Sequence, residues 1–380
     1  MADMVLDTDV IASIAERVRA AAASGTPLRL RGGGSKDFYG QALQGEVLDT
    51  SALAGVVSYE PSELVVTVRV ATPLAELEAL LAEQGQCLPF EPPHFGPGGT
   101  VGGMVASGLS GPARASAGAV RDFMLGLKLI NGRGEALTFG GQVMKNVAGY
   151  DVSRLMVGAM GTLGLLTEVS LKVLPVAPAE ASLRFECSQA QALDWLNAWG
   201  GQPLPLNASC WVQETRGMAG IGTLYLRLRG AHAAVEAACT TFSETWGGQR
   251  QDQAQAAADW QACRDQQLTW FQDRSERQDL WRLSVPQSTP PLTLPDSPLI
   301  EWHGGLRWVR AEPQHAEQLR AAAAAAGGHA TLFIAANAGQ TALTSRFDAL
   351  KSPLDRIHRA LKREFDPAGV FNPGRMSAGW

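Results

Sequence analysis

The chain has 380 residues, of which 46% are hydrophobic and 18% are charged; this length suits two or three domains, and the composition excludes a disordered chain. Its 32 Lys and Arg residues against 37 Asp and Glu give a formal charge of −5, so electrostatics give no reason to expect nucleic acid or an acidic membrane surface as a partner. Glycine is in excess, with 41 residues, and the positions of the glycines carry most of the functional signal.

The cysteines and the N-terminal segment limit the compartment and the cofactors. The five cysteines lie far apart and never form a C-x-x-C pair: Cys87, Cys187, Cys210, Cys239 and Cys263. An iron–sulfur cluster or a structural zinc site needs closely spaced thiolates, so we expect neither within this chain and predict no metal site. The acidic start MADMVLDTDV is unlike a signal peptide, and no run approaches the roughly 20 apolar residues of a membrane span. These features predict a cytoplasmic protein.

The first half alternates short strands with helices. A helical pattern runs to Ser24 and is expected to start at a cap formed by Asp7 or Thr8, and a second helix follows Thr72-Pro73 and stops at Gly85. Residues 89–118 are so rich in Gly, Pro and Ser that we expect an ordered loop with little regular structure. The predicted strands are residues 28–31, 64–70, 125–130, 136–139 and 163–174.

The second half has a different character from residue 176 onward. Helical stretches rich in Ala, Gln and Trp are expected at 231–246 and 252–282, and a helix ends before Gly327-Gly328. The tryptophans of the second stretch are expected in the core, with a partner surface as the alternative if they are exposed. The predicted strands are residues 181–187, 208–213, 222–229 and 304–310.

The first glycine cluster follows the strand at 28–31 directly. It reads Arg31-Gly32-Gly33-Gly34-Ser35. Successive glycines let backbone N–H groups turn toward one point and form a nest for an anion such as a diphosphate. The cluster lacks the G-K-[ST] of a Walker loop and the G-x-G-x-x-G spacing of a dinucleotide fold. A flexible turn is the alternative interpretation.

Two further clusters extend this pattern. Residues 96–112 include T-V-G-G-M-V-A-S-G, where the scarcity of side chains would let a flat heterocycle lie on the backbone; a compact Ω-loop is the alternative. Residues 145–169 bring loop glycines directly into a strand, through G-A-M-G-T-L-G-L-L-T-E-V. Backbone groups at the start of that strand can therefore meet a ligand.

These clusters, in this order, resemble the FAD-binding domain of the vanillyl-alcohol oxidase and p-cresol methylhydroxylase flavoprotein family. The ending F-D-P-A-G-V-F-N-P-G-R also resembles that family. The resemblance implies an α+β fold in which a PCMH-type FAD-binding domain of two α/β subdomains holds the cofactor between them. It places this domain at residues 1–175, an α+β cap at 176–359, and a tail at 360–380 that returns to the FAD domain.

The resemblance also implies which residues hold FAD. The first loop would bind the diphosphate, the second would line the cofactor, and the third would meet the ribityl and adenine side. Covalent members often carry a histidine in the first loop; here Ser35 stands there and the second cluster has no cysteine, so noncovalent FAD is expected. Arg31 has an equal alternative as an ordinary charge at the strand end. The implied cofactor residues are Arg31, Gly32, Gly33, Gly34, Ser35, Gly98, Gly99, Thr100, Gly102, Gly103, Ser107, Gly108, Gly161, Thr162, Gly164 and Val169.

Within the family, the runs S-G-P-A-R, G-A-V-R-D-F-M-L-G and V-M-K-N-V-A-G-Y-D-V-S-R-L-M-V-G are similar to those of FAD-binding subunits of bacterial glycolate oxidases. This implies two partners, a second FAD-containing catalytic subunit and an iron–sulfur subunit, through which the chain could associate peripherally with the inner membrane. Relatives that oxidise lactate or glycolate carry a G-H-x-G-D-G-N-like segment late in the chain. Here residues 327–339 contain only His329 and Asn337 in a loose match, which argues against independent substrate oxidation.

Oxidation of a 2-hydroxy acid also needs a base near the hydroxyl and a cation for the carboxylate. His94 is close in sequence to the second glycine cluster. Glu301, His303 and Arg307 are at odd positions of a predicted strand and would share one face. A solvated face beside an inward-pointing Trp302 is the blander alternative.

The remaining histidines are expected to have no catalytic role. We expect surface or structural positions for His232, His315, His329 and His358.

Three functions are compatible with these residues. The first, which the resemblance favours, is an FAD-binding subunit of a glycolate oxidase or dehydrogenase complex that passes electrons toward an iron–sulfur partner. The second is a self-sufficient FAD-dependent dehydrogenase of a small 2-hydroxy acid that uses His303 or His94 with Arg307. The third is a structural subunit whose FAD is redox-silent.

Overall fold

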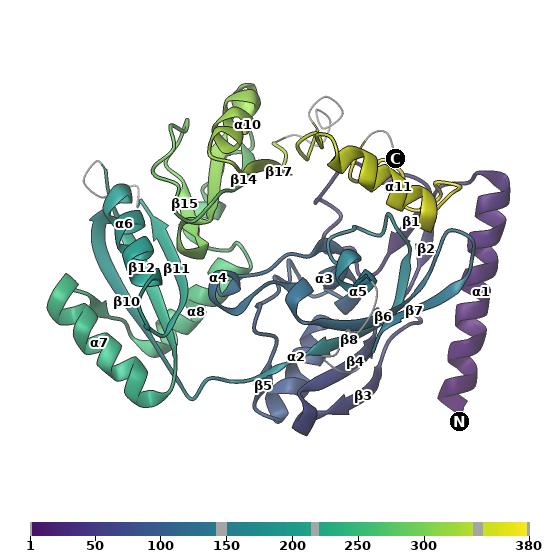
Figure 1. Cartoon of the computed structure of the whole chain (residues 1–380), viewed down its shortest axis with the longest axis horizontal. Coiled ribbons are helices and arrows are strands. Elements are labelled where there is room, and N and C mark those ends of the chain that lie inside the picture. The colour runs from purple at the N-terminus through teal and green to yellow at the C-terminus, as the bar shows by residue number, and fades with distance from the viewer. Residues whose placement is uncertain (1, 142–149, 214–219, 337–344, 378–380) are drawn as a thin grey trace.

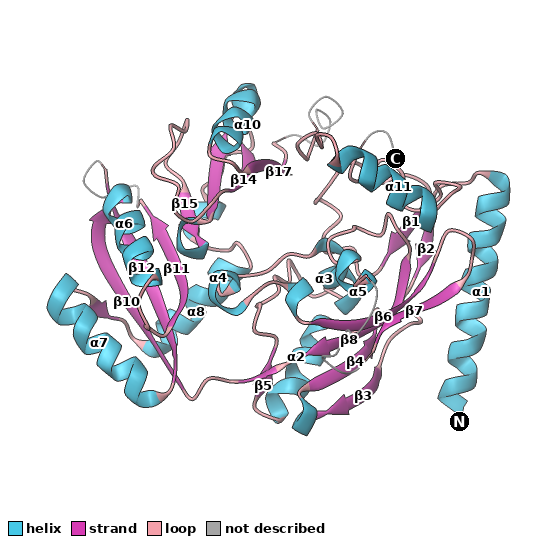
Figure 2. Ribbon diagram, in the orientation of Figure 1, coloured by secondary structure: helices cyan, strands magenta, loops and turns pink. Residues whose placement is uncertain are grey.

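A computed structural model describes residues 2–141, 150–213, 220–336 and 345–377 of the chain. The molecule has two lobes, and both ends of the chain lie on the same lobe (Figure 1). Helices and strands are mixed in each lobe (Figure 2), so the expected α+β class is confirmed. The motif residues 145–149 and Asn337, singled out from the sequence, lie outside the described residues.

The first lobe, called the FAD lobe below, is built from one antiparallel five-stranded sheet and two small two-stranded sheets. The large sheet has the order β3-β4-β8-β6-β7, and β1 pairs with β2 in parallel. Its elements are α1 (Ala2–Ser24), β1 (Leu28–Arg31), β2 (Glu46–Asp49), β3 (Val56–Glu60), β4 (Val65–Arg69), α2 (Leu74–Glu83), β5 (Gln86–Cys87), α3 (Val101–Ser107), α4 (Arg114–Ala117), β6 (Met124–Ile130), β7 (Ala136–Gly140), α5 (Val152–Leu155), β8 (Leu165–Lys172) and β9 (Leu174–Pro175).

The second lobe, the cap, holds one antiparallel eight-stranded sheet in the order β13-β10-β12-β11-β15-β16-β14-β17. Its elements are β10 (Ala179–Ser188), α6 (Gln189–Gly200), β11 (Leu206–Val212), β12 (Ile221–Gly230), α7 (His232–Trp246), β13 (Gln249–Arg250), α8 (Gln253–Arg264), α9 (Thr269–Gln272), β14 (Asp279–Ser284), β15 (Leu299–Glu301), β16 (Leu306–Ala311), α10 (Ala316–Ala325) and β17 (His329–Ile334). The last helix, α11 (Leu354–Phe365), lies on the FAD lobe (Figure 1). The domain boundaries remain predictions.

The structure corrects three sequence predictions. Helix α1 begins at Ala2, so positions 7 and 8 lie inside it and its start is earlier than expected. Residues 89–118 hold more regular structure than the little that was expected, because they contain α3 and α4. The stretch 252–282 is not one helix: it ends as strand β14, where pairing with β16 and β17 in the sheet overrides the helical composition.

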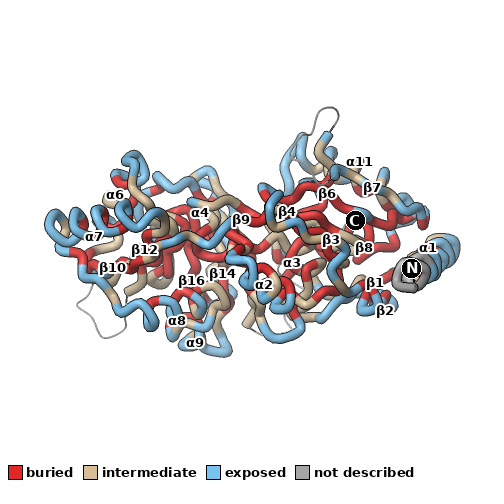
Figure 3. Tube along the Cα trace, turned by 90° about the horizontal axis from the view of Figure 1, so that it is seen from below, coloured by how far each residue is buried: buried red, intermediate tan, exposed pale blue. Residues whose placement is uncertain are grey.

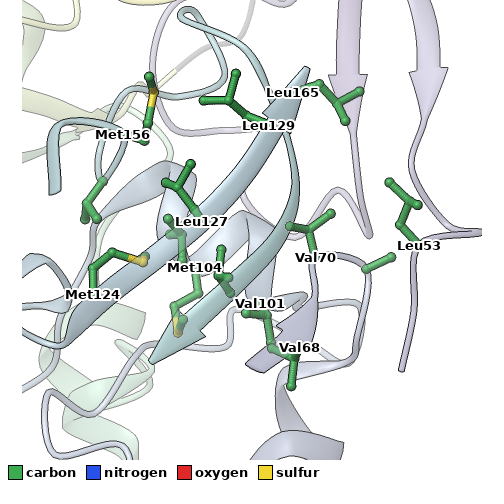
Figure 4. Packing of buried hydrophobic residues seen from close by; sticks show 14 of the residues in the cluster. Leu53, Val68, Val70, Val101, Met104, Met124, Leu127, Leu129, Met156 and Leu165 are labelled. Carbon is green, nitrogen blue, oxygen red and sulfur yellow. The ribbon is translucent and has the colours of Figure 1, made fainter. Parts of the chain in front are cut away.

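Buried apolar side chains form one core in the FAD lobe and two in the cap. In the FAD lobe, side chains from β4, α3, β6 and β8 meet in one cluster (Figure 4). A further cluster joins the lobes, since Tyr39, Leu109 and Met160 pack with cap residues. Trp260, Trp270 and Trp281 are all buried, so the core interpretation of the Trp-rich stretch is correct. Buried segments are found in the interior of both lobes (Figure 3).

The tail is fastened inside the FAD lobe by a buried ion pair. Lys362 on α11 contacts Asp366 at 2.6 Å and donates to the carbonyls of Thr162 and Phe371 at 2.7 and 3.0 Å. The Asp366 carboxylate also accepts hydrogen bonds from the backbone of Val370 and Phe371. These bonds fix the final segment against the loop that leads into β8.

Candidate functional site

A deep cleft opens in the FAD lobe between the small β1–β2 sheet and the large sheet. Its volume is about 1010 Å³ including its open mouth, which is at the upper end of the range for small-molecule and cofactor sites. All three glycine clusters contribute to its walls, together with residues of the tail. The fold therefore brings the three glycine motifs, which are separated along the chain, together at one cleft.

The first two loops approach each other so closely that only glycine fits. A Cβ atom on Gly33 would lie 1.6 Å from the carbonyl oxygen of Gly98, and one on Gly98 would lie 2.8 Å from that of Gly33. Any larger residue would force the two backbones apart. The glycines are thus required by the shape of the cleft and do not merely make the loops flexible.

The second loop continues as the short helix α3. The sequence did not predict this helix because of its cleft-lining glycines. The Thr100 hydroxyl caps its start by accepting from Gly103 N at 3.1 Å, and Gly108 ends it with φ of 62°. A Cβ on Gly102 would lie 2.8 Å from Val70 Cβ, so the helix packs tightly on the end of β4. This packing keeps the exposed face of α3 turned toward the cleft.

The third loop is joined to β1 by one side chain from the tail. Asn372 accepts from the backbone N of Leu30 at 2.9 Å and donates to the carbonyl of Met160 at 2.7 Å. Its backbone has a positive φ of 40°. Gly161 faces this side chain, because a Cβ there would lie 2.7 Å from Nδ2 of Asn372.

Arg375 holds the segment that follows the first loop. Its guanidinium donates to the carbonyls of Gln41, Lys36 and Asp37, the last at 3.1 Å. Burial lowers the pKa of Arg375 to about 10, which still leaves it charged at neutral pH. Sequence reasoning placed the tail on this lobe but did not identify Asn372 or Arg375 as cleft residues, because nothing in the tail motif shows which of its polar groups point inward.

Lys36 is a second cationic cleft residue that the motif reading missed. Its ammonium lies 5.7 Å from the Phe95 ring centroid, and burial lowers its pKa to about 8 despite the opposing charge of Asp265. Asp37 is the sole carboxylate among the described residues that line the cleft, and it is paired with Arg29 at 3.0 Å. The wall is therefore electropositive and fits the negative diphosphate of FAD.

The predicted cofactor residues divide into two groups. Those lining the cleft are Arg31, Gly32, Gly33, Gly34, Ser35, Gly98, Thr100, Gly102, Gly103, Ser107, Gly161 and Gly164. Gly99, Gly108, Thr162 and Val169 do not line it. Val169 is fully buried in the core, and Thr162 is buried with its hydroxyl donating to Ala159. These two contribute to the shape of the site from behind its wall.

The structure does not bring the catalytic candidates together on one strand face. The strand breaks after Glu301, where Trp302 and His303 take positive φ values of 54° and 53°. The shared-face prediction is therefore wrong, and so is the solvated-face alternative, because Glu301 and Arg307 are buried. Arg307 donates to the carbonyls of Gly304 and Thr289, so it cannot reach a substrate.

The two candidate bases have structural partners outside the cleft. The His303 ring bridges Ser116 of the FAD lobe at 2.9 Å and Ser209 of the cap at 3.0 Å. Burial lowers its pKa to about 4, which keeps it neutral. His94 contacts Glu78 through Nε2 at 2.8 Å. Neither histidine lines the cleft.

A second cavity lies between the lobes, beside the cleft. It measures about 1590 Å³ including its open mouth and shares Tyr39, Ser107 and Met160 with the cleft. Gly108 lies in its wall on the FAD-lobe side, and His329 lies in its wall on the cap side. His329 was expected to be structural, and no sequence motif around it predicts a position in a cavity wall.

The described residues hold no group of three or more His, Cys, Asp or Glu side chains placed to bind a metal ion. None of the described helices is both long and apolar enough to cross a membrane. All five cysteines are free thiols.

Comparison with known proteins places the chain among flavoproteins. A family model described as FAD binding domain matches residues 2–140. Glycolate oxidase subunit GlcE of Escherichia coli (strain K12) is 45% identical over 99% of both chains. The mitochondrial D-lactate dehydrogenase [cytochrome] of Arabidopsis thaliana is 33% identical over 37% of this chain and 25% of its own. The prediction of FAD as the cofactor is thereby confirmed.

Among solved structures, an alkyldihydroxyacetonephosphate synthase superposes with a TM-score of 0.62 at 15% identity. The match covers 95% of this chain and 74% of the synthase. At this identity the likeness concerns the fold alone. It supports the expected FAD-domain and cap architecture across both lobes.

Proposed function

The chain belongs to the GlcE family of glycolate oxidase subunits, and on this premise we propose that it holds FAD noncovalently within a complex that oxidises glycolate to glyoxylate. The carrying observation is the cleft, in which three glycine loops and the tail converge on one electropositive wall. Bound FAD supplies the redox chemistry. The chain's own residues bind the cofactor, exclude water from it and fix its position.

The position of the diphosphate follows from the loops. Gly32, Gly33 and Gly34 line the cleft without side chains of their own, so their backbone N–H groups would meet the diphosphate, and Lys36 adds a cation at the same wall. No histidine or cysteine is among the described residues of the cleft wall. Without such a nucleophile the wall offers no covalent link to the flavin, which supports a dissociable cofactor.

The electron path points to partners. The five free cysteines are dispersed, so an iron–sulfur cluster that accepts electrons from the flavin would be in another chain. We assign a second FAD-containing catalytic subunit and an iron–sulfur subunit to the same complex. The proposal includes a cytoplasmic location, with any contact to the inner membrane made through these partners.

The alternative of a self-sufficient dehydrogenase based on His303 or His94 has little geometric support. Both rings are engaged with structural partners, and Arg307 is fully buried. A redox-silent FAD is the other alternative. Measuring whether the flavin can be reduced tests it.

The test starts from the purified chain. Its visible spectrum is recorded, the flavin is released with acid, and glycolate is added anaerobically to the chain alone and to the chain mixed with its partner subunits. We expect releasable FAD that bleaches only in the complex. Bleaching of the isolated chain would favour the self-sufficient enzyme, and flavin that resists reduction in the complex would favour the structural role.

A matched pair of variants links the flavin to the cleft. Gly33→Ala places a methyl group against the Gly98 carbonyl, whereas Gly200→Ala adds one in the cap where no atom lies within 4 Å. We expect Gly33→Ala to purify with little FAD and Gly200→Ala to keep a full complement. Equal FAD content in the two variants would contradict the proposed position of the cofactor.

A further inference from the structure

The cavity between the lobes is lined by three guanidinium groups from both lobes. Arg114 and Arg121 come from the FAD lobe and Arg282 from strand β14 of the cap, and none of the described residues lining the cavity is acidic. None of the three forms an ion pair within 4 Å with any residue that the structure describes. Arg114 and Arg282 are partly buried, whereas Arg121 is exposed. Partly buried cations without an ion-pair partner are costly unless a bound anion compensates them.

Two of these cations are held in place by one indole ring. The guanidinium carbon of Arg114 lies 4.4 Å from the ring centroid of Trp302, and that of Arg282 lies 5.0 Å from it. Trp302 is fixed in turn, because its Nε1 donates to the carbonyl of Gly111 at 2.9 Å. The ring therefore positions one cation from each lobe without neutralising either of them.

The backbone that carries Trp302 is held in an unfavourable conformation. Trp302 and His303, neither of them glycine, have successive positive φ values, and Gly304 follows with 97°. Such strain costs free energy and is found mainly where function requires an exact placement. The residue so held, Trp302, lines the cavity.

The sheet of the cap places Arg282 on the cavity side. Arg282 pairs with Thr331, and Ser284 pairs with His329, across β14 and β17. Alternate residues of a strand share a face, so Arg282 and Ser284 lie on one side of the sheet with His329. Burial and the charge of Arg282 lower the pKa of His329.

We infer that this cavity binds the carboxylate of a small 2-hydroxy or 2-oxo acid between Arg114 and Arg282. The inference deepens the proposed function and rests on it, because it assigns the substrate class to this chain. Planar guanidinium groups match the geometry of a carboxylate. The wall also carries apolar side chains, among them Leu109, Val157 and Met376, and suits a ligand with one charged end. The cavity shares Tyr39, Ser107 and Met160 with the FAD cleft, so the acid would lie beside the cofactor site.

The test measures binding by calorimetry on the FAD-loaded chain. Acetate carries the carboxylate without a hydroxyl to oxidise, acetamide has the same shape without charge, and inorganic phosphate is an anion of different geometry. We expect acetate and glycolate to bind and to compete, acetamide to give no heat, and phosphate to leave glycolate binding unchanged. Displacement of glycolate by phosphate at equal concentration would overturn the assignment to a carboxylate.

Variants then identify the site. Arg282→Gln and Arg114→Gln should each weaken glycolate and acetate binding at least about tenfold, because each removes a charge-assisted contact. Arg310→Gln is the matched control: it also removes an arginine stacked on a tryptophan, but Arg310 is paired with Asp296 and does not line the cavity. Unchanged carboxylate affinity in both cavity variants would overturn the inference.

Two further readouts keep the result unambiguous. Thermal unfolding shows whether Arg282→Gln is folded, and Arg282→Lys, which keeps the charge, should retain part of the affinity that Arg282→Gln loses. FAD content and complex formation are measured on the same samples. A chain that binds FAD and partners but no carboxylate would overturn this inference alone, whereas a chain without FAD would overturn the proposed function.

Discussion

The two cavities of this protein are built in opposite ways. The FAD cleft is lined by consecutive residues of three loops, and its shape depends on atoms that are missing, since no side chain fits where Gly33 passes Gly98. The cavity between the lobes is lined by scattered residues, and its character depends on long side chains from Arg114 and Arg282. A site lined by backbone can be recognised from contiguous sequence motifs. A site lined by side chains that are far apart in the sequence cannot.

The difference has an energetic side as well. The cleft belongs to one lobe and is closed by the tail, so it should survive disturbance of the cap. The second cavity exists only while the lobes keep their relative position. That position is held by an interlobe ion cluster, in which Glu91 accepts from Arg227 at 2.7 Å and from Arg229 at 2.8 Å. Variants that act on one lobe or on the junction should therefore separate the two sites.

The largest effect is expected from the tail anchor. Lys362→Met leaves the buried Asp366 carboxylate without its cation, which should lower the free energy of unfolding by about 3–5 kcal/mol. The same change releases the segment carrying Asn372 and Arg375, so FAD should be lost with the stability. Chemical denaturation with flavin fluorescence measures both.

The neighbouring Arg363→Met is the control for this prediction, because Arg363 is exposed on the same helix. It should leave unfolding and FAD content within experimental error. If Lys362→Met retained FAD as tightly as the unaltered chain, the tail would not be part of the cleft's architecture.

The second largest effect is expected from the ion cluster between the lobes. Glu91→Gln removes the charge that compensates Arg227, whose side chain is only 3% exposed, and should cost about 2–3 kcal/mol. We expect carboxylate binding between the lobes to weaken while FAD stays bound, because the cleft does not use this cluster. Calorimetry and flavin absorbance on one preparation compare the two sites directly; parallel loss of both ligands would contradict their independence.

The same carboxylate predicts a pH dependence. Burial alone would raise the pKa of Glu91, but Arg227 and Arg229 hold it below its ordinary value of 4.5. The stabilisation is therefore present above pH 4.5 and is lost as the pH falls through the lowered value. Acid unfolding should show a greater loss of stability below pH 4.5 in the unaltered chain than in Glu91→Gln, and identical acid profiles would exclude this contribution.

A smaller effect on stability is expected from a buried hydrogen bond inside the cap. Trp308 Nε1 donates to the buried Glu301 carboxylate at 2.6 Å, so Trp308→Phe should cost about 1–3 kcal/mol beyond the lost volume. Trp199→Phe is matched, since Trp199 is also buried and its Nε1 has no hydrogen-bond partner among the described residues. Thermal unfolding compares them, and an equal loss in the two variants would show that volume alone decides.

Much of the FAD lobe could be predicted from the sequence because its signals are local. The strands predicted at 125–130 and 136–139 are present as the antiparallel pair β6 and β7, and the Asn131 side chain stabilises the turn between them by accepting from the backbone of Arg133 and Glu135. The glycine loops were found for the same reason. Helix α3 was missed because the glycines that admit a ligand also hide helical propensity.

The cavity between the lobes could not be predicted in the same way. Sequence spacing placed Glu301, His303 and Arg307 on one strand face, but the positive φ values at Trp302 and His303 break the strand. The residues that do line the cavity, Arg114 and Arg282, are 168 positions apart in the numbering and meet only through a tertiary contact on Trp302. No periodicity or motif encodes a contact of that kind.

The smallest effect tests whether His303 has any catalytic role. His303→Gln replaces a neutral ring by a neutral amide that can still hydrogen-bond Ser116 or Ser209, so stability should change by about 1 kcal/mol or less. With its pKa lowered to about 4 by burial, His303 does not change charge between pH 5.5 and 8. Glycolate oxidation by the assembled complex should therefore keep its rate within about twofold and keep the shape of its pH profile. A large fall in kcat together with a displaced acidic limb would restore His303 as a base, and with it the possibility that this chain completes the oxidation alone.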